Sequence, residues 1–298
     1  MGIVYFGTAL VLTSVGVVAA TCEALWLWCA GQVVLALAFQ SWWVLLHEAG
    51  HDNLFRTRWL NRGGGVIAGF FALIPSASWR LVHRDHHRWT GWQDKDLTTE
   101  SLVPRPLGRS ERVLANTCWK LWLPLFSTVY RLGNFWNVPR LWRRYPDSRR
   151  RMVTSVAVLL LCYTALIWIV GPAQLTGIAG LGVLLGMALQ DPLILSQHTH
   201  VPMNVSNGAS KVRPFTPLQQ EEFTRSLAFP TWLGRGILMN VGAHELHHMY
   251  PAVPAYDLHK IDYEPRNLVN GLRWIARAKR VPADVFLFQN RNTSGLDL

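Results

Sequence analysis

The chain has 298 residues, half of them hydrophobic and only 16% charged, with a mean hydropathy of +0.14. This composition excludes a disordered chain and a small domain stapled by disulfides. Lys and Arg number 29 against 18 Asp and Glu, which gives a formal charge of +11. On a soluble protein such an excess would suggest a nucleic-acid partner, but here the positions of the cations matter more than their total.

Two stretches of the chain, residues 1–46 and 152–196, contain no Lys or Arg. Each stretch is long enough for two helical crossings of about 20 residues, because a helix rises 1.5 Å per residue and the hydrocarbon layer is about 30 Å thick. The sequence therefore predicts four transmembrane helices in two hairpins, at residues 3–20, 25–46, 152–170 and 175–196.

All 29 cations lie in the two remaining segments, residues 47–151 and 197–298. A hairpin returns the chain to the side it left, so both segments and both termini lie on one side, which the positive-inside rule makes cytoplasmic. Shorter apolar stretches at 66–77 and 114–130 are expected to be interfacial or re-entrant helices. The predicted fold is an all-α integral membrane protein, a single domain with a helical cytoplasmic cap, in a bacterial inner membrane.

Ten of the eleven histidines fall in four short clusters, HEAGH, HRDHH, QHTH and HELHH, and only His259 stands apart. On a helix, positions i, i+3 and i+4 share a face, so each cluster can present its imidazoles together. The predicted topology places all four clusters on one membrane face. Ten imidazoles are enough for two metal ions with four or five ligands each, although imidazole suits zinc, copper, iron and nickel alike.

These motifs resemble the boxes HxxxH, HxxHH and HxxHH of the membrane fatty acid desaturase superfamily. The resemblance extends over about residues 43–256 and is carried by the stretches HEAGHDNLF, HRDHHRWTGWQDKD, QHTHVP and HELHHMYPAVPAY. It implies two iron ions held by histidines in a four-helix membrane fold with a cytosolic cap.

The resemblance also implies which side chains bind the metals, with the QHTH pair contributing His198 and with His200 either a ligand or a group that supports one. The implied metal-ligating set is His47, His51, His83, His86, His87, His198, His200, His244, His247 and His248. Carboxylates near the boxes are candidates to accept the second imidazole N–H and so to orient the rings. They are Glu48, Asp52, Asp85, Asp94, Asp96, Asp191 and Glu245.

Such a centre uses O2 as co-substrate, and removing two hydrogens from an acyl chain gives a double bond, a reaction of lipid metabolism. The acyl chain could be part of a lipid, an acyl carrier protein, an acyl-coenzyme A or a free acid. The sequence has neither a Cys-based cluster motif nor a Gly-rich dinucleotide motif, so electrons are expected from a ferredoxin, rubredoxin or cytochrome b5 with its reductase. Five arginines, Arg143, Arg144, Arg149, Arg150 and Arg151, could steer acidic partners or adhere to anionic lipid.

Several alternatives share parts of this pattern. Hydroxylases, terminal-alkene-forming decarboxylases and carotenoid oxygenases of the same superfamily carry the same boxes. HEAGH and HELHH also match the HExxH motif of a zinc protease, in which the Glu is the general base. A protease would leave HRDHH and QHTH unexplained. A metal carrier would require His or acidic side chains within the spans, where they are nearly absent.

Overall fold

The computed structural model describes residues 1–208 and 211–298, and the described chain is mostly helical. It divides into two compact units, which are described separately. The first unit consists of Met1–Leu81, Thr128–Gln190 and Ile237–Met239. The second unit consists of Val82–Ser127, Asp191–Gly236 and Asn240–Leu298.

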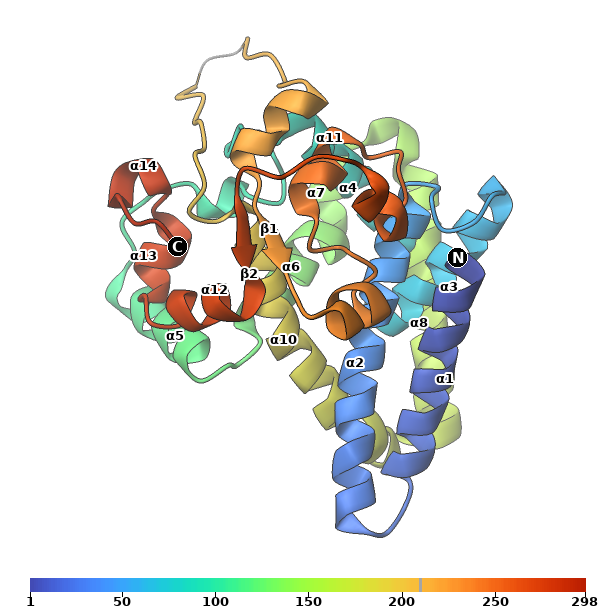
Figure 1. Ribbon diagram of the computed structural model, residues 1–298. Helices are drawn as coiled ribbons and strands as arrows, with labels where there is room; N and C mark the ends of the chain where they lie inside the picture. The colour runs from blue at the N-terminus through green and yellow to red at the C-terminus, as the bar shows by residue number, and fades with distance from the viewer. Residues whose placement is uncertain (209–210) are drawn as a thin grey trace. The chain divides into compact units, whose positions relative to one another are not determined.

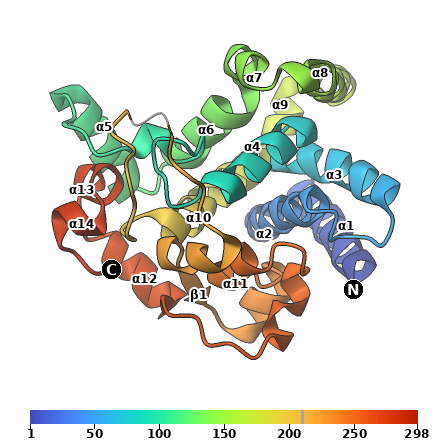
Figure 2. The same ribbon diagram turned by 90° about the horizontal axis from the view of Figure 1, so that it is seen from above.

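The first unit begins with an antiparallel helical hairpin of α1 (Gly2–Ala20) and α2 (Leu25–Gly50). The two helices approach closely at glycine, since a Cβ on Gly31 would lie 2.6 Å from the backbone nitrogen of Ala20. Viewed from above, α1, α2 and α3 (Arg58–Ala72) lie side by side (Figure 2).

A sharp bend of 97° separates α3 from α4 (Ser76–Trp89). The backbone at Leu73 is left-handed, with φ of 58°, and Pro75 follows, so a single helix cannot continue through this point. The apolar stretch expected at 66–77 is therefore the end of one helix and the start of the next, and α3 begins eight residues earlier than that stretch, at Arg58.

The first unit resumes within α6 (Leu125–Arg131), at Thr128, and continues with the π-helix η2 (Leu132–Trp136), α7 (Val138–Arg144) and the 3-10 turn η3 (Pro146–Ser148). The second long hairpin is α8 (Arg149–Val170), α9 (Pro172–Leu175), the π-helix η4 (Thr176–Gly180) and α10 (Leu181–His198). Polar side chains of α2 fasten it to this hairpin: Trp28 donates to Gly177 O at 2.9 Å and Gln32 donates to Ile178 O at 2.8 Å.

Four helical segments in the described chain are long and apolar enough to cross a membrane, or five if the bent pair α3 and α4 counts as one span. Their ranges overlap the four predicted spans, and three of them are longer than the sequence predicted, since α8 already begins at Arg149 rather than at residue 152. The helix α2 continues to Gly50 and α10 continues to His198. Consequently, His47 and His198 lie within helices rather than just after them.

The second unit combines short helices with one pair of strands (Figure 1). Its elements are η1 (Glu100–Leu102), α5 (Arg109–Lys120), η5 (Pro217–Phe223), η6 (Trp232–Ile237), α11 (His244–Met249), η7 (Ala255–Lys260), α12 (Gly271–Ala278), α13 (Ala283–Phe288) and α14 (Arg291–Ser294). The strands β1 (Ser226–Ala228) and β2 (Leu268–Asn270) pair in parallel, with Ser226 opposite Leu268. This pair departs from the all-α prediction.

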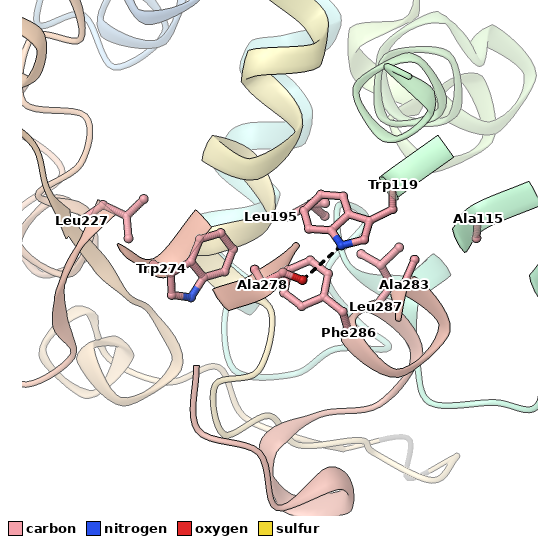
Figure 3. Close-up of a cluster of buried hydrophobic side chains, with 9 residues drawn as sticks. All are labelled: Ala115, Trp119, Leu195, Leu227, Trp274, Ala278, Ala283, Phe286 and Leu287. Carbon is pink, nitrogen blue, oxygen red and sulfur yellow. Dashed lines mark hydrogen bonds between the residues drawn. The ribbon is translucent and has the colours of Figure 1, made fainter. Parts of the chain in front are cut away.

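An aromatic cluster joins α5, α12 and α13 in the second unit (Figure 3). Phe286 is fully buried and stacks on Trp119 with ring centroids 5.0 Å apart. The indole N–H of Trp119 donates to Ala278 O at 3.1 Å, so the ring is both packed and hydrogen-bonded. The cluster holds the carboxyl-terminal helices on the rest of this unit.

Candidate metal centre

Seven of the ten clustered histidines come together inside the second unit. Three lie on the last two turns of α4, one ends α10, and three lie on the six-residue helix α11. Because positions i, i+3 and i+4 share a helix face, each HxxHH motif aims its three imidazoles in one direction. The seven are His83, His86, His87, His198, His244, His247 and His248.

Four of these imidazoles form one compact group, His86, His198, His244 and His248, whose ligand nitrogens all lie within 4.8 Å of one another. The Nε2 atom of His244 is 2.9 Å from that of His198 and 3.1 Å from that of His248. Ring nitrogens at such separations share either a proton or a bound cation, because two imidazole nitrogens that both lack a proton repel one another.

Hydrogen bonds of the Nδ1 atoms orient three of the four rings, so that their Nε2 atoms point toward one another. The Nδ1 atom of His86 lies 2.6 Å from Asp96 Oδ2, and that of His248 lies 2.8 Å from Gln220 Oε1. His198 Nδ1 is 3.2 Å from Phe223 O. Each of these partners is an acceptor, which assigns the proton to Nδ1 and leaves Nε2 free to bind a metal ion. This arrangement fits a divalent cation.

The electrostatics of the group agree with neutral rings and an anionic support. Burial, with the neighbouring His87 and His244, holds the pKa of His248 well below its usual range. Burial alone would raise the pKa of Asp96, but His86 and the hydrogen bond from Thr98 outweigh burial and lower it. The Asp96 carboxylate also accepts the Thr98 N–H and hydroxyl, both at 2.9 Å.

The other three imidazoles of the second unit form a second, adjoining set. The Nε2 atom of His87 is 3.0 Å from that of His83 and 2.9 Å from that of His247. The ring of His87 also stacks on that of His248, with centroids 4.4 Å apart. The unit thus contains two adjoining imidazole sets.

The first box, HEAGH, lies at the end of α2 in the first unit. His47 and His51 are one turn apart, with ring centroids 5.0 Å from each other. The Nδ1 atom of His47 is 2.9 Å from Glu48 Oε1, and Glu48 is fully buried. The box therefore has an imidazole pair on one helix face, and the neighbouring Glu48 orients the His47 ring.

Two of the seven candidate carboxylates, Glu48 and Asp96, lie within hydrogen-bond distance of a histidine, at 2.9 Å from His47 and 2.6 Å from His86. Asp52 pairs with Arg80 at 2.8 Å, and Asp94 accepts the Ser206 N–H at 2.9 Å. Asp191 accepts the Ser127 N–H at 2.6 Å. Asp85 lies half-buried on α4.

The carboxylate of Glu245 accepts hydrogen bonds from backbone N–H groups rather than from a histidine. It accepts the N–H of Asn267 at 2.7 Å and that of Ser226 at 3.1 Å, so it ties α11 to the β1–β2 pair. A general base in an HExxH protease would need this carboxylate to reach a metal-bound water. In this structure both carboxylate oxygens accept backbone N–H groups, which argues against HELHH being the motif of a zinc protease.

His200 lies apart from the other histidines of the second unit. Its Nε2 atom is 3.1 Å from Val285 O and its Nδ1 atom is 3.2 Å from Ser294 Oγ. The ring lies parallel to Phe286, with centroids 5.8 Å apart. Both ring nitrogens therefore have partners in the carboxyl-terminal segment.

Sequence reasoning missed Gln220, which lies in η5 and touches two histidines. Its Oε1 accepts from His248, while its Nε2 donates to His87 O at 2.7 Å. The side chain is buried, so both ends of the amide are satisfied by the histidine helices. No sequence motif surrounds Gln220. Its two contacts arise because η5 packs beside the helices that carry His87 and His248.

We expect Asp96→Asn to weaken metal binding about 10-fold to 100-fold, the usual effect of losing the partner of a ligand histidine. Asparagine can accept the His86 N–H but lacks the charge that favours the ligating form of the ring. The measurement is the apparent iron affinity in a chelator competition. Asp94→Asn is the matched control, because Asp94 bonds Ser206 instead of a histidine. Equal affinities of the two variants would contradict the assignment of Asp96.

The chain belongs to the fatty acid desaturase family, whose model matches residues 24–275. An acyl-lipid omega-3 desaturase (cytochrome b5) of the endoplasmic reticulum from Arabidopsis thaliana is 24% identical over 83% of this chain and 66% of its own. An sn-1 oleoyl-lipid 12-desaturase from Picosynechococcus sp. is 24% identical, over 74% of this chain and 63% of its own. An sn-2 acyl-lipid omega-3 desaturase (ferredoxin) from Helianthus annuus is 23% identical, over 74% and 51%. The chain thus spans about two thirds or less of the length of these relatives.

Proposed function

We propose that this protein is an O2-dependent di-iron oxidoreductase of the membrane that introduces a double bond into a fatty acyl chain. One observation carries the proposal: four imidazoles from three separate chain segments present their ligand nitrogens within 4.8 Å of one another. Family membership makes iron, rather than zinc or copper, the metal we propose. Desaturation is favoured over hydroxylation, decarboxylation or carotenoid oxidation because the relatives compared are named as desaturases.

In this proposal the chain's residues hold two iron ions in place. His86, His198, His244 and His248 would bind one ion. His83, His87 and His247 would bind the other. The ligand set proposed from the resemblance also includes His47 and His51 of the first box. The bound irons would activate O2, the oxidant of the reaction, because no side chain can oxidise an unactivated C–H bond. Asp96, Gln220 and Glu48 would keep the imidazoles in the ligating tautomer.

The proposed surroundings follow from the apolar helices and from the names of the relatives. We place the four apolar helices across a bacterial inner membrane, with both histidine-bearing segments and both termini in the cytoplasm. An acyl chain would reach the irons from the bilayer. Relatives named for cytochrome b5 and for ferredoxin support a separate protein as electron donor.

The test is expression in a bacterial host with a ferredoxin and its reductase co-supplied, followed by mass spectrometry of the lipids and hydrocarbons. We expect a double bond that cells with an empty vector lack, and about two irons per purified chain. An alcohol, a shortened 1-alkene or an oxidised carotenoid would move the assignment to that sibling reaction. One zinc per chain, with cleavage of a membrane protein, would overturn the proposal.

A further inference from the structure

A pocket of about 650 Å³ opens in the first unit beside the first histidine box. Its size is within the range of small-molecule binding sites, about 300–1,000 Å³. Residues of α2, α3, the start of α4 and the first half of α8 line it, including Ala49 and Gly50, the neighbours of His51. The proposed reaction gives this pocket no role.

One part of the pocket wall is strongly cationic. Arg62 of α3, Arg80 of α4, and Arg150 and Arg151 of α8 all line it. Asp52 pairs with Arg80 at 2.8 Å. Among the described residues, no ion pair is formed by the other three arginines. Four arginines thus line a single pocket and one of them is paired with a carboxylate, an excess of positive charge that favours an anionic ligand.

The first turn of α8 adds further positive charge beside the pocket. It begins with Arg149, Arg150 and Arg151 and contains no acidic residue. The amino-terminal end of a helix carries a partial positive charge, so cations there are unfavourable unless an anion neutralises them. An anionic group held by the four arginines of the pocket would supply this negative charge.

The remaining wall of the pocket is apolar. Val66 and Phe70 of α3 and Val158 and Leu159 of α8 line it. Val158 is 41% exposed, and it lies on α8, one of the helices apolar enough to cross a membrane. A ligand that fits both walls has an anionic group joined to a hydrocarbon chain.

We propose that this pocket binds one glycerophospholipid with an anionic head group. The phosphate would lie among the four arginines, because the planar guanidinium fork matches phosphate oxygens in pairs. The start of one acyl chain would lie along Val66, Phe70, Val158 and Leu159. This inference does not depend on the reaction proposed above, because it concerns binding and not turnover.

The test is native mass spectrometry of the purified full-length protein, with phosphatidylglycerol or phosphatidylcholine added at equal concentration. We expect one phosphatidylglycerol per chain at low lipid concentration and at least about 10-fold weaker binding of phosphatidylcholine. Arg150→Gln with Arg151→Gln is expected to lower the affinity for phosphatidylglycerol about 10-fold or more. Val158→Trp, which fills the apolar wall, is expected to lower it as well.

Matched controls remove the same groups outside the pocket. Arg58→Gln with Arg143→Gln removes two exposed cations that do not line it, and Val153→Trp enlarges a residue 40% exposed on the same helix. These controls should bind phosphatidylglycerol as the parent does, and melting temperatures measured in parallel confirm folding. Equal loss in controls and test variants would show general adhesion of lipid to basic surface and would overturn the proposal. Displacement of the lipid by millimolar inorganic phosphate would overturn it too, since a free anion would then suffice.

Discussion

A His244→Ala variant is expected to form no detectable double-bonded product and to keep at most one iron per chain. His244 lies between two other imidazoles, with its Nε2 atom 2.9 Å from that of His198 and 3.1 Å from that of His248. Removing its ring takes away the nitrogen that lies between the other two. Because loss of a supporting contact alone costs about 10-fold to 100-fold in metal affinity or activity, loss of this ring should cost at least about 100-fold.

The measurements are iron per chain by plasma emission spectroscopy and product by lipid profiling, with the electron donor supplied in excess. His259→Ala is the matched control, because His259 is exposed and belongs to no histidine cluster. It should retain both irons and full activity. A His244→Ala variant that keeps two irons and normal product would show that the four-imidazole group is not a metal site, and the proposed function would lose its main support.

The sequence predicted the mostly helical chain and the family correctly, because both depend on local patterns. Long apolar stretches without cations become helices, and the spacing HxxHH places three imidazoles on one helix face whatever the rest of the fold does. The two short strands escaped prediction, since the three residues of β1 pair with β2 some 40 positions later in the chain. Nothing within Ser226–Ala228 itself distinguishes a strand from a loop.

The partners of the histidines could not be derived from the sequence, because they depend on distant contacts. Asp94 and Asp96 are two positions apart and looked equivalent, yet Ser206 holds Asp94 while Thr98 holds Asp96 against His86. Gln220 reaches His248 only because η5 returns to the helices that carry the boxes.

His200 illustrates how a helix end changes the outcome for a neighbouring residue. The helix α10 ends at His198, and the backbone at His200 is left-handed, with φ of 51°. A ring two positions beyond a helix end no longer follows the helical periodicity on which the prediction depended. It therefore reaches Val285 and Ser294 instead of the four-imidazole group.

The end of α10 also depends on one buried cation, Arg225, and its replacement is expected to have the largest effect on stability. Arg225 is 4% exposed, and its guanidinium donates to Ser196 O at 2.8 Å, Thr199 O at 2.7 Å and His200 O at 2.7 Å. Burial lowers the pKa of Arg225 to about 10, so the group is still charged at neutral pH. The last carbonyls of a helix have no partner within the helix, and Arg225 supplies a donor to one of them, Ser196 O, as well as to the two carbonyls that follow the helix.

We expect Arg225→Met to lower the free energy of unfolding by about 3–5 kcal/mol, because three buried carbonyls would lose their donor and each unsatisfied group costs about 1–3 kcal/mol. The measurement is the melting temperature of the detergent-solubilised protein, together with iron per chain, since His198 lies beside the anchored carbonyls. Arg273→Met is the matched control, because Arg273 is exposed on α12 and a surface change of this kind is usually within about 0.5 kcal/mol. If Arg225→Met melted at the same temperature as Arg273→Met and kept its iron, the guanidinium would not be what holds the end of α10 and the His198 ring in place.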